Sequence, residues 1–322
     1  MAPWRWLLQQ ATLSVAVLVL AGCAGKPLEY PGLADREDLE IPRAVELTGT
    51  PFFPDDSYYC GPAALATLLV ASGVETTDTE IVERVYLPES QGSLQKELLG
   101  AARRADRIPY QIEPHLKDLL SEVQHGNPVL VLQNLALERL PVWHYAVVVG
   151  YDLDEQEITL RSEEQKRQTL SMRRFERTWQ RADRWAIVIP EPGQIPASAT
   201  ADNWVAAVAE LERQQRWEAA KAGYRAAQER WPQHSTAWFG LGNVYYANSD
   251  YRSAAKAYQQ AIEHDEDFAA AWHNLAWALL RQGKVEGALE AAQRSEHLAP
   301  EHPRYGSVSE TIRNAAEEAD VL

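Results

Sequence analysis

Cysteine and positive charge are both scarce in this chain of 322 residues. Its two cysteines cannot supply the disulfide framework that holds many small secreted domains together. The formal net charge is -15 at pH 7, and a surface of that sign repels phosphate-rich polymers. The sequence therefore predicts no nucleic acid among the partners of this protein.

Motifs for cofactors are lacking as well. The cysteines and histidines are too scattered to match the paired spacing of a metal site, and there is no glycine-rich phosphate loop. We therefore expect no metal and no cofactor. What is present is an ordinary globular composition, with 46% apolar and 24% charged residues. A chain of this length has room for two folded domains and a targeting segment.

The N-terminal segment has the pattern of a secretory signal. Arg5 is followed by the apolar run 11–20, which is about half as long as the ~20 residues that a spanning helix needs. The run ends at Leu20-Ala-Gly-Cys23, which resembles the bacterial lipobox. The resemblance implies that residues 1–22 are removed and that Cys23 is acylated, which would anchor the chain in a lipid bilayer. The alternative is an ordinary signal followed by a coincidental cysteine.

The residues after Cys23 bear on where the protein is held. Ala24 in this position is typical of lipoproteins sent to the outer membrane, so the expected location is the bacterial cell envelope, at the periplasmic face of that membrane. Residues 23–46 are rich in Pro, Gly and charge and show no helical or strand period, which predicts a tether. Folded structure is expected to begin near Leu47.

Cys60 opens a segment with the features of a helix. Pro62 suits the first turn, alanine and leucine fill the body, and Gly73 suits the end. Unpaired backbone N–H groups at a helix N-terminus favour a thiolate, so we expect a lowered pKa and a nucleophilic role for Cys60. The alternative is a buried structural cysteine, since free cysteine is among the most buried residue types.

His144 stands at the start of an apolar run, 145–151, that predicts a buried strand. A strand of this composition fixes the backbone and therefore aims the imidazole. His115 lies in a polar helix start and His125 precedes a probable turn, so both are expected at the surface. His144 is therefore the candidate general base for Cys60.

Both segments resemble a single family. Cys60-Gly-Pro-Ala-Ala-Leu65 and Trp143-His-Tyr-Ala-Val-Val-Val-Gly150 look like the nucleophile and histidine motifs of the double-glycine leader peptidases, family thirty-nine of the cysteine peptidases. The resemblance covers residues 47–190. It implies an α+β papain-like fold in which the cysteine attacks a carbonyl carbon and the histidine takes and returns the proton.

The chain departs from that family at two positions. Relatives usually carry an Asp near the end of the next strand to orient the imidazole, and here Ser162 occupies the matching position, where its hydroxyl adds no charge. Relatives place a Gln six residues before the cysteine, and here that residue is Pro54, followed by Asp55 and Asp56. A carboxylate cannot donate a hydrogen bond to an oxyanion, so weak turnover is expected.

The C-terminal part repeats with a period of 34 residues. The positions that recur with this spacing are Trp204, Trp238 and Trp272; Ala220, Ala254 and Ala288; and Tyr224 and Tyr258. The pattern resembles tetratricopeptide repeats and predicts an all-α array of three helix pairs at 203–302, after a linker at 191–202 and before a cap helix at 303–322. The recurring aromatic residues are expected in the core, and the array is expected to fold without the first domain.

Two functions fit this organisation. The first is an envelope-anchored thiol peptidase that cleaves peptide or protein substrates recruited by the repeats. The alternative is a scaffold whose peptidase-like domain has lost turnover and only binds peptides, as the changes at Pro54 and Ser162 would permit. Retention of both Cys60 and His144 favours the enzyme.

Overall fold

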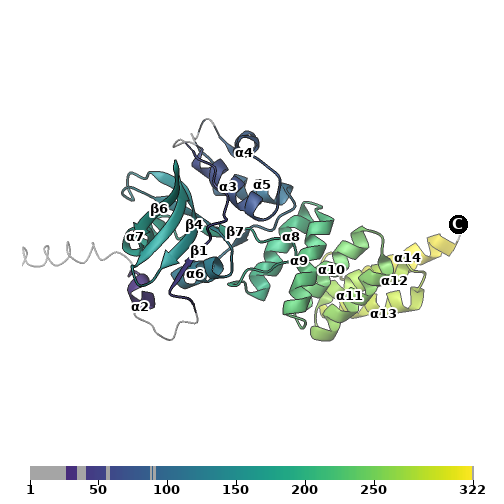
Figure 1. Cartoon of the computed structure of the whole chain (residues 1–322). Coiled ribbons are helices and arrows are strands. Elements are labelled where there is room, and N and C mark those ends of the chain that lie inside the picture. Colours follow the sequence, from purple (N-terminus) through teal and green to yellow (C-terminus); the bar gives the residue numbers. More distant parts are fainter. Residues whose placement is uncertain (1–26, 35–40, 56–58, 88, 90–91, 321–322) are drawn as a thin grey trace, which may run out of the picture.

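The computed structural model describes residues 27–34, 41–55, 59–87, 89 and 92–320. It has an α+β domain built around one sheet, followed by an array of helices that extends away from it, from α8 beside the sheet domain to α14 at the far end (Figure 1). The predicted fold class, a peptidase-like α+β domain followed by an all-α repeat array, is confirmed. Within the described ranges, no helix is long and apolar enough to cross a membrane.

The sheet of the first domain has its strands in the order β2-β7-β3-β4-β5-β6, and β1 pairs with the far end of β4. All of the pairings are antiparallel. The strands are β1 (Ala44–Glu46), β2 (Tyr110–Gln111), β3 (Val129–Asn134), β4 (Trp143–Asp152), β5 (Glu157–Ser162), β6 (Gln165–Ser171) and β7 (Ala186–Val188).

Helices cover both faces of this sheet. One face packs against α3, α4 and α5, and the other packs against α6 and α7. These helices are α3 (Cys60–Ala71), α4 (Asp78–Val85), α5 (Gln95–Arg104), α6 (Leu116–Gln124) and α7 (Met172–Gln180). Side chains of a strand point alternately to its two faces, so a strand covered on both sides must be apolar throughout. That is why the central strands read as unbroken apolar runs.

Strand β4 illustrates this division. Tyr145 and Val147 join the core beneath α3, whereas Ala146 and Val148 join the core beneath α6. The register with β5 shifts between Val148 and Gly150, and a Cβ added at Gly150 would lie 2.7 Å from the carbonyl oxygen of a β1 residue. Glycine is therefore required where β1 crosses close to the irregular part of β4.

The segment predicted to be a tether, 23–46, is packed in its described parts, which corrects that prediction. Helix α2 (Tyr30–Ala34) docks on the domain, because the buried carboxylate of Glu176 accepts hydrogen bonds from the backbone N–H groups of Glu29 and Tyr30, at 2.7 and 3.0 Å. Arg184 forms ion pairs with both Glu29 and Glu176. Helix α2 and strand β1 have only three to five residues, which is too short to show a period, so the sequence pattern does not predict them.

The repeat array consists of three antiparallel helix pairs and one further helix. The pairs are α8 (Ala201–Arg213) with α9 (Trp217–Arg230), α10 (Ser235–Ala247) with α11 (Tyr251–His264), and α12 (Ala269–Leu280) with α13 (Val285–Leu298); α14 (Val308–Asp320) follows. Tyr224 and Tyr258 are 1% exposed, as their recurrence predicts. A Cβ at Gly240 would overlap the ring of Tyr224, and a Cβ at Gly242 would overlap that of Tyr258, so these glycines make room for the tyrosines.

The tryptophans of the repeat, expected mostly in the core, are buried to different depths. Trp204 is fully buried. Trp238 and Trp272 are only partly buried, and each donates its indole N–H to a backbone carbonyl six residues earlier, at 2.8 and 2.9 Å. Trp204 differs because the first domain covers it, and the second and third repeats have no such cover.

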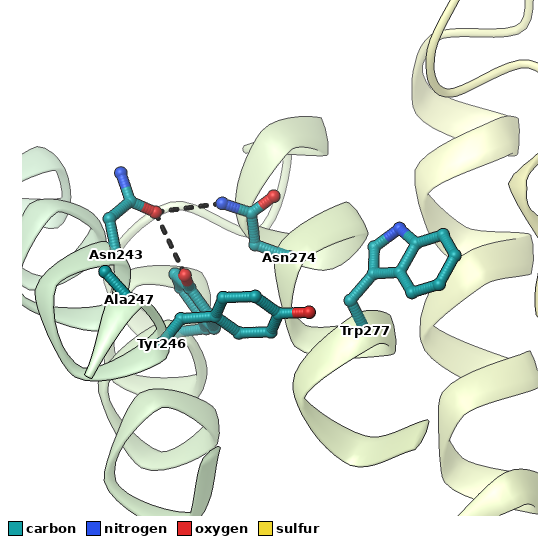
Figure 2. A pocket seen from close by; sticks show the side chains of 6 residues that line it. Asn243, Tyr246, Ala247, Asn274 and Trp277 are labelled. Carbon is teal, nitrogen blue, oxygen red and sulfur yellow. Dashed lines mark hydrogen bonds between the residues drawn. The ribbon is translucent and has the colours of Figure 1, made fainter. Parts of the chain in front are cut away.

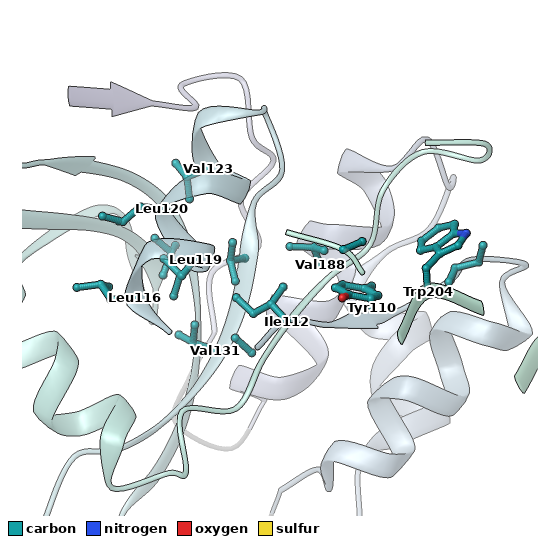
Figure 3. Packing of buried hydrophobic residues seen from close by; sticks show 14 of the residues in the cluster. Tyr110, Ile112, Leu116, Leu119, Leu120, Val123, Val131, Val188 and Trp204 are labelled. Atoms are coloured by element: carbon teal, nitrogen blue, oxygen red, sulfur yellow. The ribbon is translucent and has the colours of Figure 1, made fainter. Parts of the chain in front are cut away.

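One hydrophobic core runs through the junction between the two domains (Figure 3). Trp204 and Val208 of α8 belong to the same cluster as Ile108 and Tyr110 of the sheet domain. The rings of Tyr110 and Trp204 lie 6.2 Å apart. The first repeat is therefore packed as an extension of the peptidase-like domain. This junction also involves residues of the predicted linker, since the buried carboxylate of Glu122 accepts a hydrogen bond from the N–H of Ser198 at 2.7 Å.

Candidate active site

Cys60 is the first residue of α3, and this helix packs against β4. The side chain is 7% exposed. The next residue, Gly61, lies so close to Ser93 and Tyr145 that an added Cβ would be 3.0 to 3.3 Å from their side chains. The glycine thus lets the start of the helix approach the strand that carries His144.

The pKa of the Cys60 thiol is raised from its ordinary value, mainly because the residue is buried. Backbone N–H groups of Tyr145, Gly61 and Cys60 itself act in the opposite direction, and the negative charge of Asp55 adds to the increase. The backbone N–H groups at the helix N-terminus do lower the pKa of Cys60, as predicted. The net change is nevertheless an increase, so the predicted direction is wrong. Burial and a neighbouring carboxylate are tertiary effects that outweigh it.

His144 is the second residue of β4 and is 6% exposed. Its Nε2 lies 2.8 Å from Oγ of Ser162, the last residue of β5. Burial lowers the pKa of His144, and the charge of Glu163 partly opposes that effect. Ser162 therefore contacts the imidazole at the position where the family usually has an Asp, and its hydroxyl brings no charge to the histidine.

Cys60 contacts the strand that carries His144. The backbone N–H that favours the Cys60 thiolate most strongly is that of Tyr145, the residue directly after His144. Because Nε2 of His144 faces Ser162, Nδ1 is the ring nitrogen left to exchange a proton with a reacting group. The arrangement is a buried thiol, a neutral imidazole and a hydroxyl that fixes the imidazole.

A cleft of about 520 Å³ is lined in part by Pro54, Asp55 and Tyr59, the residue directly before Cys60. Pro54 stands where relatives carry a Gln, and it offers neither a side-chain donor nor a backbone N–H. The backbone N–H of Asp55 donates to the carbonyl oxygen of Glu163 at 3.2 Å, which fastens this loop to the turn after Ser162. Pro54, where the sequence departs from its relatives, therefore lines this cleft.

The other histidines of the first domain and the turn after β4 take no part in this site. His115 and His125 are exposed, as predicted. The carboxylate of Asp152 accepts hydrogen bonds from the backbone N–H groups of Asp154 and Glu155, both at 2.9 Å, which is the behaviour of a turn residue. Cys23 lies outside the described residues. Among the residues that are described, no group of three or more His, Cys, Asp or Glu could hold a metal ion.

A second concave region lies in the repeat array (Figure 2). Asn243 is central to it, because its Oδ1 accepts hydrogen bonds from Nδ2 of Asn274 at 2.9 Å and from the hydroxyl of Tyr258 at 3.0 Å. Tyr246 and Trp277 also line this pocket. Amide groups fixed in this way, beside aromatic side chains, form a surface suited to an extended peptide.

Residues 38–187 match the model of the Peptidase_C39 like family. This domain is C39-like. A solved structure of a C39-like peptidase from Bacillus anthracis is similar to 47% of this chain over 98% of its own length, with 16% sequence identity and a TM-score of 0.41. The match to the family model agrees with the resemblance drawn from the motifs around Cys60 and His144.

Residues 205–249 and 241–303 match the tetratricopeptide repeat model. Tetratricopeptide repeat protein 8 of Mus musculus is 32% identical over 79 residues, which cover 23% of this chain and 15% of that protein. The type III secretion translocator chaperone SycD of Yersinia enterocolitica is similar to 38% of this chain and 87% of its own, with 17% identity and a TM-score of 0.34. The chain thus combines a peptidase-like domain with repeats of a class that binds proteins or peptides.

The charge of Asp55 gives a direct test of the site. Asp55→Asn should lower the pKa of the Cys60 thiol, because it removes the carboxylate that disfavours the thiolate. More thiolate at a given pH means that iodoacetamide should alkylate Cys60 several-fold faster, about two- to tenfold. Alkylation rates measured across a pH series report this shift. The control is Glu83→Gln, an equal charge change on an exposed residue of α4; a similar shift in the control would contradict a local effect.

Proposed function

We propose that the chain is a thiol peptidase in which Cys60 attacks the carbonyl carbon of a peptide bond. His144 takes the thiol proton at Nδ1 as the C–S bond forms and returns it to the leaving amine as the C–N bond breaks. Water then hydrolyses the thioester with the same histidine as base. The observation that carries the proposal is the placement of a buried thiol beside the strand whose histidine is held by Ser162.

The proposed site has few hydrogen-bond donors to stabilise the oxyanion. The backbone N–H of Cys60 is available at the helix N-terminus, but Pro54 supplies no second donor and Asp55 brings negative charge near the thiol. Loss of one oxyanion donor costs on the order of a hundredfold or more in rate. Slow turnover is therefore expected, and assays need long incubations and high enzyme concentrations.

The direct test uses unlabelled peptide mixtures and mass spectrometry. The native chain should release new peptide termini, and Cys60→Ala should release none above background. Cys60→Ser is the matched control, because it replaces the thiol with a hydroxyl of similar size but much lower nucleophilic reactivity. Equal activity in the native chain and in Cys60→Ala would refute the peptidase function.

A second candidate function is a peptide-binding scaffold without turnover. The observations that favour it are the absence of a donor at Pro54 and the raised pKa of Cys60. In that case the native chain and Cys60→Ala would bind the same peptides with the same affinity, and neither would cleave them. The repeats contribute to either function, because the pocket around Asn243 gives a peptide a second contact on the same molecule.

Membrane anchoring through Cys23 is part of the proposal. Glu29 follows Cys23 by six residues, and its backbone is bound by the buried Glu176. Fully extended, six residue steps span at most roughly 22 Å, so an acyl anchor at Cys23 would hold the domain close to the bilayer surface. We propose that the protein faces the periplasm from the outer membrane of a bacterial envelope.

Lipid labelling tests the anchor. The native chain, expressed in a bacterial host with labelled palmitate, should incorporate label and sediment with the membrane fraction. Cys23→Ala should incorporate none and appear in the soluble fraction. Cys60→Ala serves as control, since it removes the other cysteine and should leave labelling unchanged. Recovery of the native chain as an unlabelled soluble protein would contradict lipidation.

A further inference from the structure

Exposed apolar side chains of the described chain concentrate around the candidate active site. Seven large ones are exposed, and they lie on three segments. Tyr59 directly precedes Cys60, and Leu94 follows Ser93, whose carbonyl accepts a hydrogen bond from Tyr145. The remaining five lie on the hairpin that leads into His144: Leu135, Leu137, Leu140, Val142 and Trp143. Exposed apolar patches of this kind mark binding surfaces.

The hairpin between β3 and β4 is held firmly enough to present these side chains. Asn134 is 1% exposed, and its Oδ1 accepts hydrogen bonds from the N–H groups of Ala136 and Val142, both at 3.1 Å. Arg181 of the segment after α7 donates to its backbone carbonyl at 2.8 Å. Leu137 and Leu140 face each other across the turn and are 70% and 74% exposed. The hairpin is therefore held in a conformation that exposes these apolar side chains to solvent instead of packing them against the core.

The cleft lined by Tyr59 has the opposite character. Three of the residues that line it are acids, namely Asp55, Asp78 and Glu164, and none of the described lining residues is basic. Glu163, which acts on the charge state of His144, adds a further carboxylate nearby. A concave site lined by one sign of charge raises the local concentration of ligands with the opposite sign. This side of the active site therefore favours cationic groups.

We propose that the substrate is an extended peptide segment that places a Lys or Arg side chain in the acidic cleft and apolar side chains against the 135–143 hairpin. The proposal rests on the proposed peptidase function and names its substrate class. Each surface includes the residue that precedes one of the reacting pair, Tyr59 before Cys60 in the cleft and Trp143 before His144 on the hairpin. One peptide that crosses the active site would therefore meet both surfaces.

The test of the acidic cleft uses three synthetic decapeptide libraries, degenerate except for one fixed Lys, Gln or Glu. The native full chain should cleave the Lys library about tenfold faster than the Glu library. Asp78→Asn combined with Glu164→Gln should remove most of this preference. Glu75→Gln combined with Glu83→Gln is the matched control, because it removes the same charge from exposed residues near α4 and should leave the preference intact. Raising NaCl to about 0.5 M should also weaken it.

The test of the hairpin uses the same libraries. Leu137→Ser combined with Leu140→Ser should lower cleavage several-fold and deplete apolar residues near the cleaved bonds, while the ratio of Lys to Glu rates stays unchanged. Glu138→Ser combined with Arg139→Ser alters the polar tip of the same hairpin and is the control. These side chains are exposed, so the variants should fold as the native chain does.

The outcomes separate this proposal from the proposed function. Equal cleavage of the Lys and Glu libraries by the native chain would overturn the substrate class and leave the peptidase intact. If no library is cleaved, the peptidase function fails, and the Cys60→Ala chain is used to capture peptides from the same libraries. Enrichment of Lys and apolar residues among the captured peptides would then support the binding specificity. Capture without such enrichment, or no capture, would overturn it.

Discussion

Replacing His144 with alanine should lower kcat/KM for peptide hydrolysis by a factor of about 10² to 10⁴, the usual contribution of a general acid–base group. The thiol of Cys60 has a raised pKa, so it is mostly protonated near neutral pH and must lose its proton as it attacks. Without the imidazole, that proton has no acceptor and the leaving amine has no donor. Initial rates on a cleavable peptide, measured with equal amounts of folded enzyme, give the ratio.

Ser162→Ala tests how much the hydroxyl that contacts His144 contributes to the rate. It removes the hydroxyl that lies 2.8 Å from Nε2 of His144 but leaves the imidazole in place. A neutral hydroxyl stabilises a charged imidazolium only weakly, so the expected loss is about tenfold. If Ser162→Ala reduced the rate as much as His144→Ala, the imidazole could not act without this hydroxyl, and the weak role given to Ser162 would be wrong.

The pH profile follows from the same two groups. Burial lowers the pKa of His144, so the imidazole stays neutral and able to accept a proton into mildly acidic solution. The rate should therefore fall only below the ordinary histidine pKa of about 6.5. This acid limb should be absent from the residual activity of His144→Ala. An acid limb unchanged in that variant would mean that another group titrates.

The repeat array shows how much a spacing predicts. The 34-residue recurrence identifies equivalent positions, and it correctly places Tyr224 and Tyr258 in the core. It cannot give the depth of burial at each copy, because depth depends on what covers that repeat. Trp204 is covered by the sheet domain, whereas Trp238 and Trp272 remain partly exposed. The periodicity therefore predicts the helical array but not how its first repeat packs against the sheet domain.

The active site shows the same limit. The order of Cys60, His144 and Ser162 along the chain predicts a thiol at a helix start and a histidine on a strand, and the structure has both. The order of the motifs along the chain suggests that the strands of His144 and Ser162 are neighbours, and the pairing of these strands brings the two side chains into contact. The direction of the Cys60 pKa does not follow, because burial and the position of Asp55 are set by the tertiary fold.

Replacing Trp204 with alanine should lower the free energy of unfolding by about 3 to 5 kcal/mol, the range for a large buried aromatic side chain. Trp204 is fully buried, lies 6.2 Å from the ring of Tyr110, and donates its indole N–H to the carbonyl of Gly223 at 2.9 Å. The substitution removes packing that joins the two domains. Urea unfolding of the full chain, followed by far-ultraviolet circular dichroism, measures the loss.

Trp238→Ala and Trp272→Ala are the matched controls for this prediction. Both occupy the same repeat position but are only partly buried, so each should cost less than about 2 kcal/mol. Equal losses at all three tryptophans would mean that the junction adds nothing to the stability of the first repeat.

A fragment that begins at Asp202 extends the same reasoning. It keeps α8 except for Ala201 but loses Ile108 and Tyr110, so it exposes the face of α8 that carries Trp204 and Val208. Contacts in repeat arrays run between neighbours, so the second and third repeats should stay helical while the first unfolds at lower urea. In that fragment Trp204→Ala should cost much less than in the full chain. The difference between the two losses measures the coupling between the peptidase-like domain and the array.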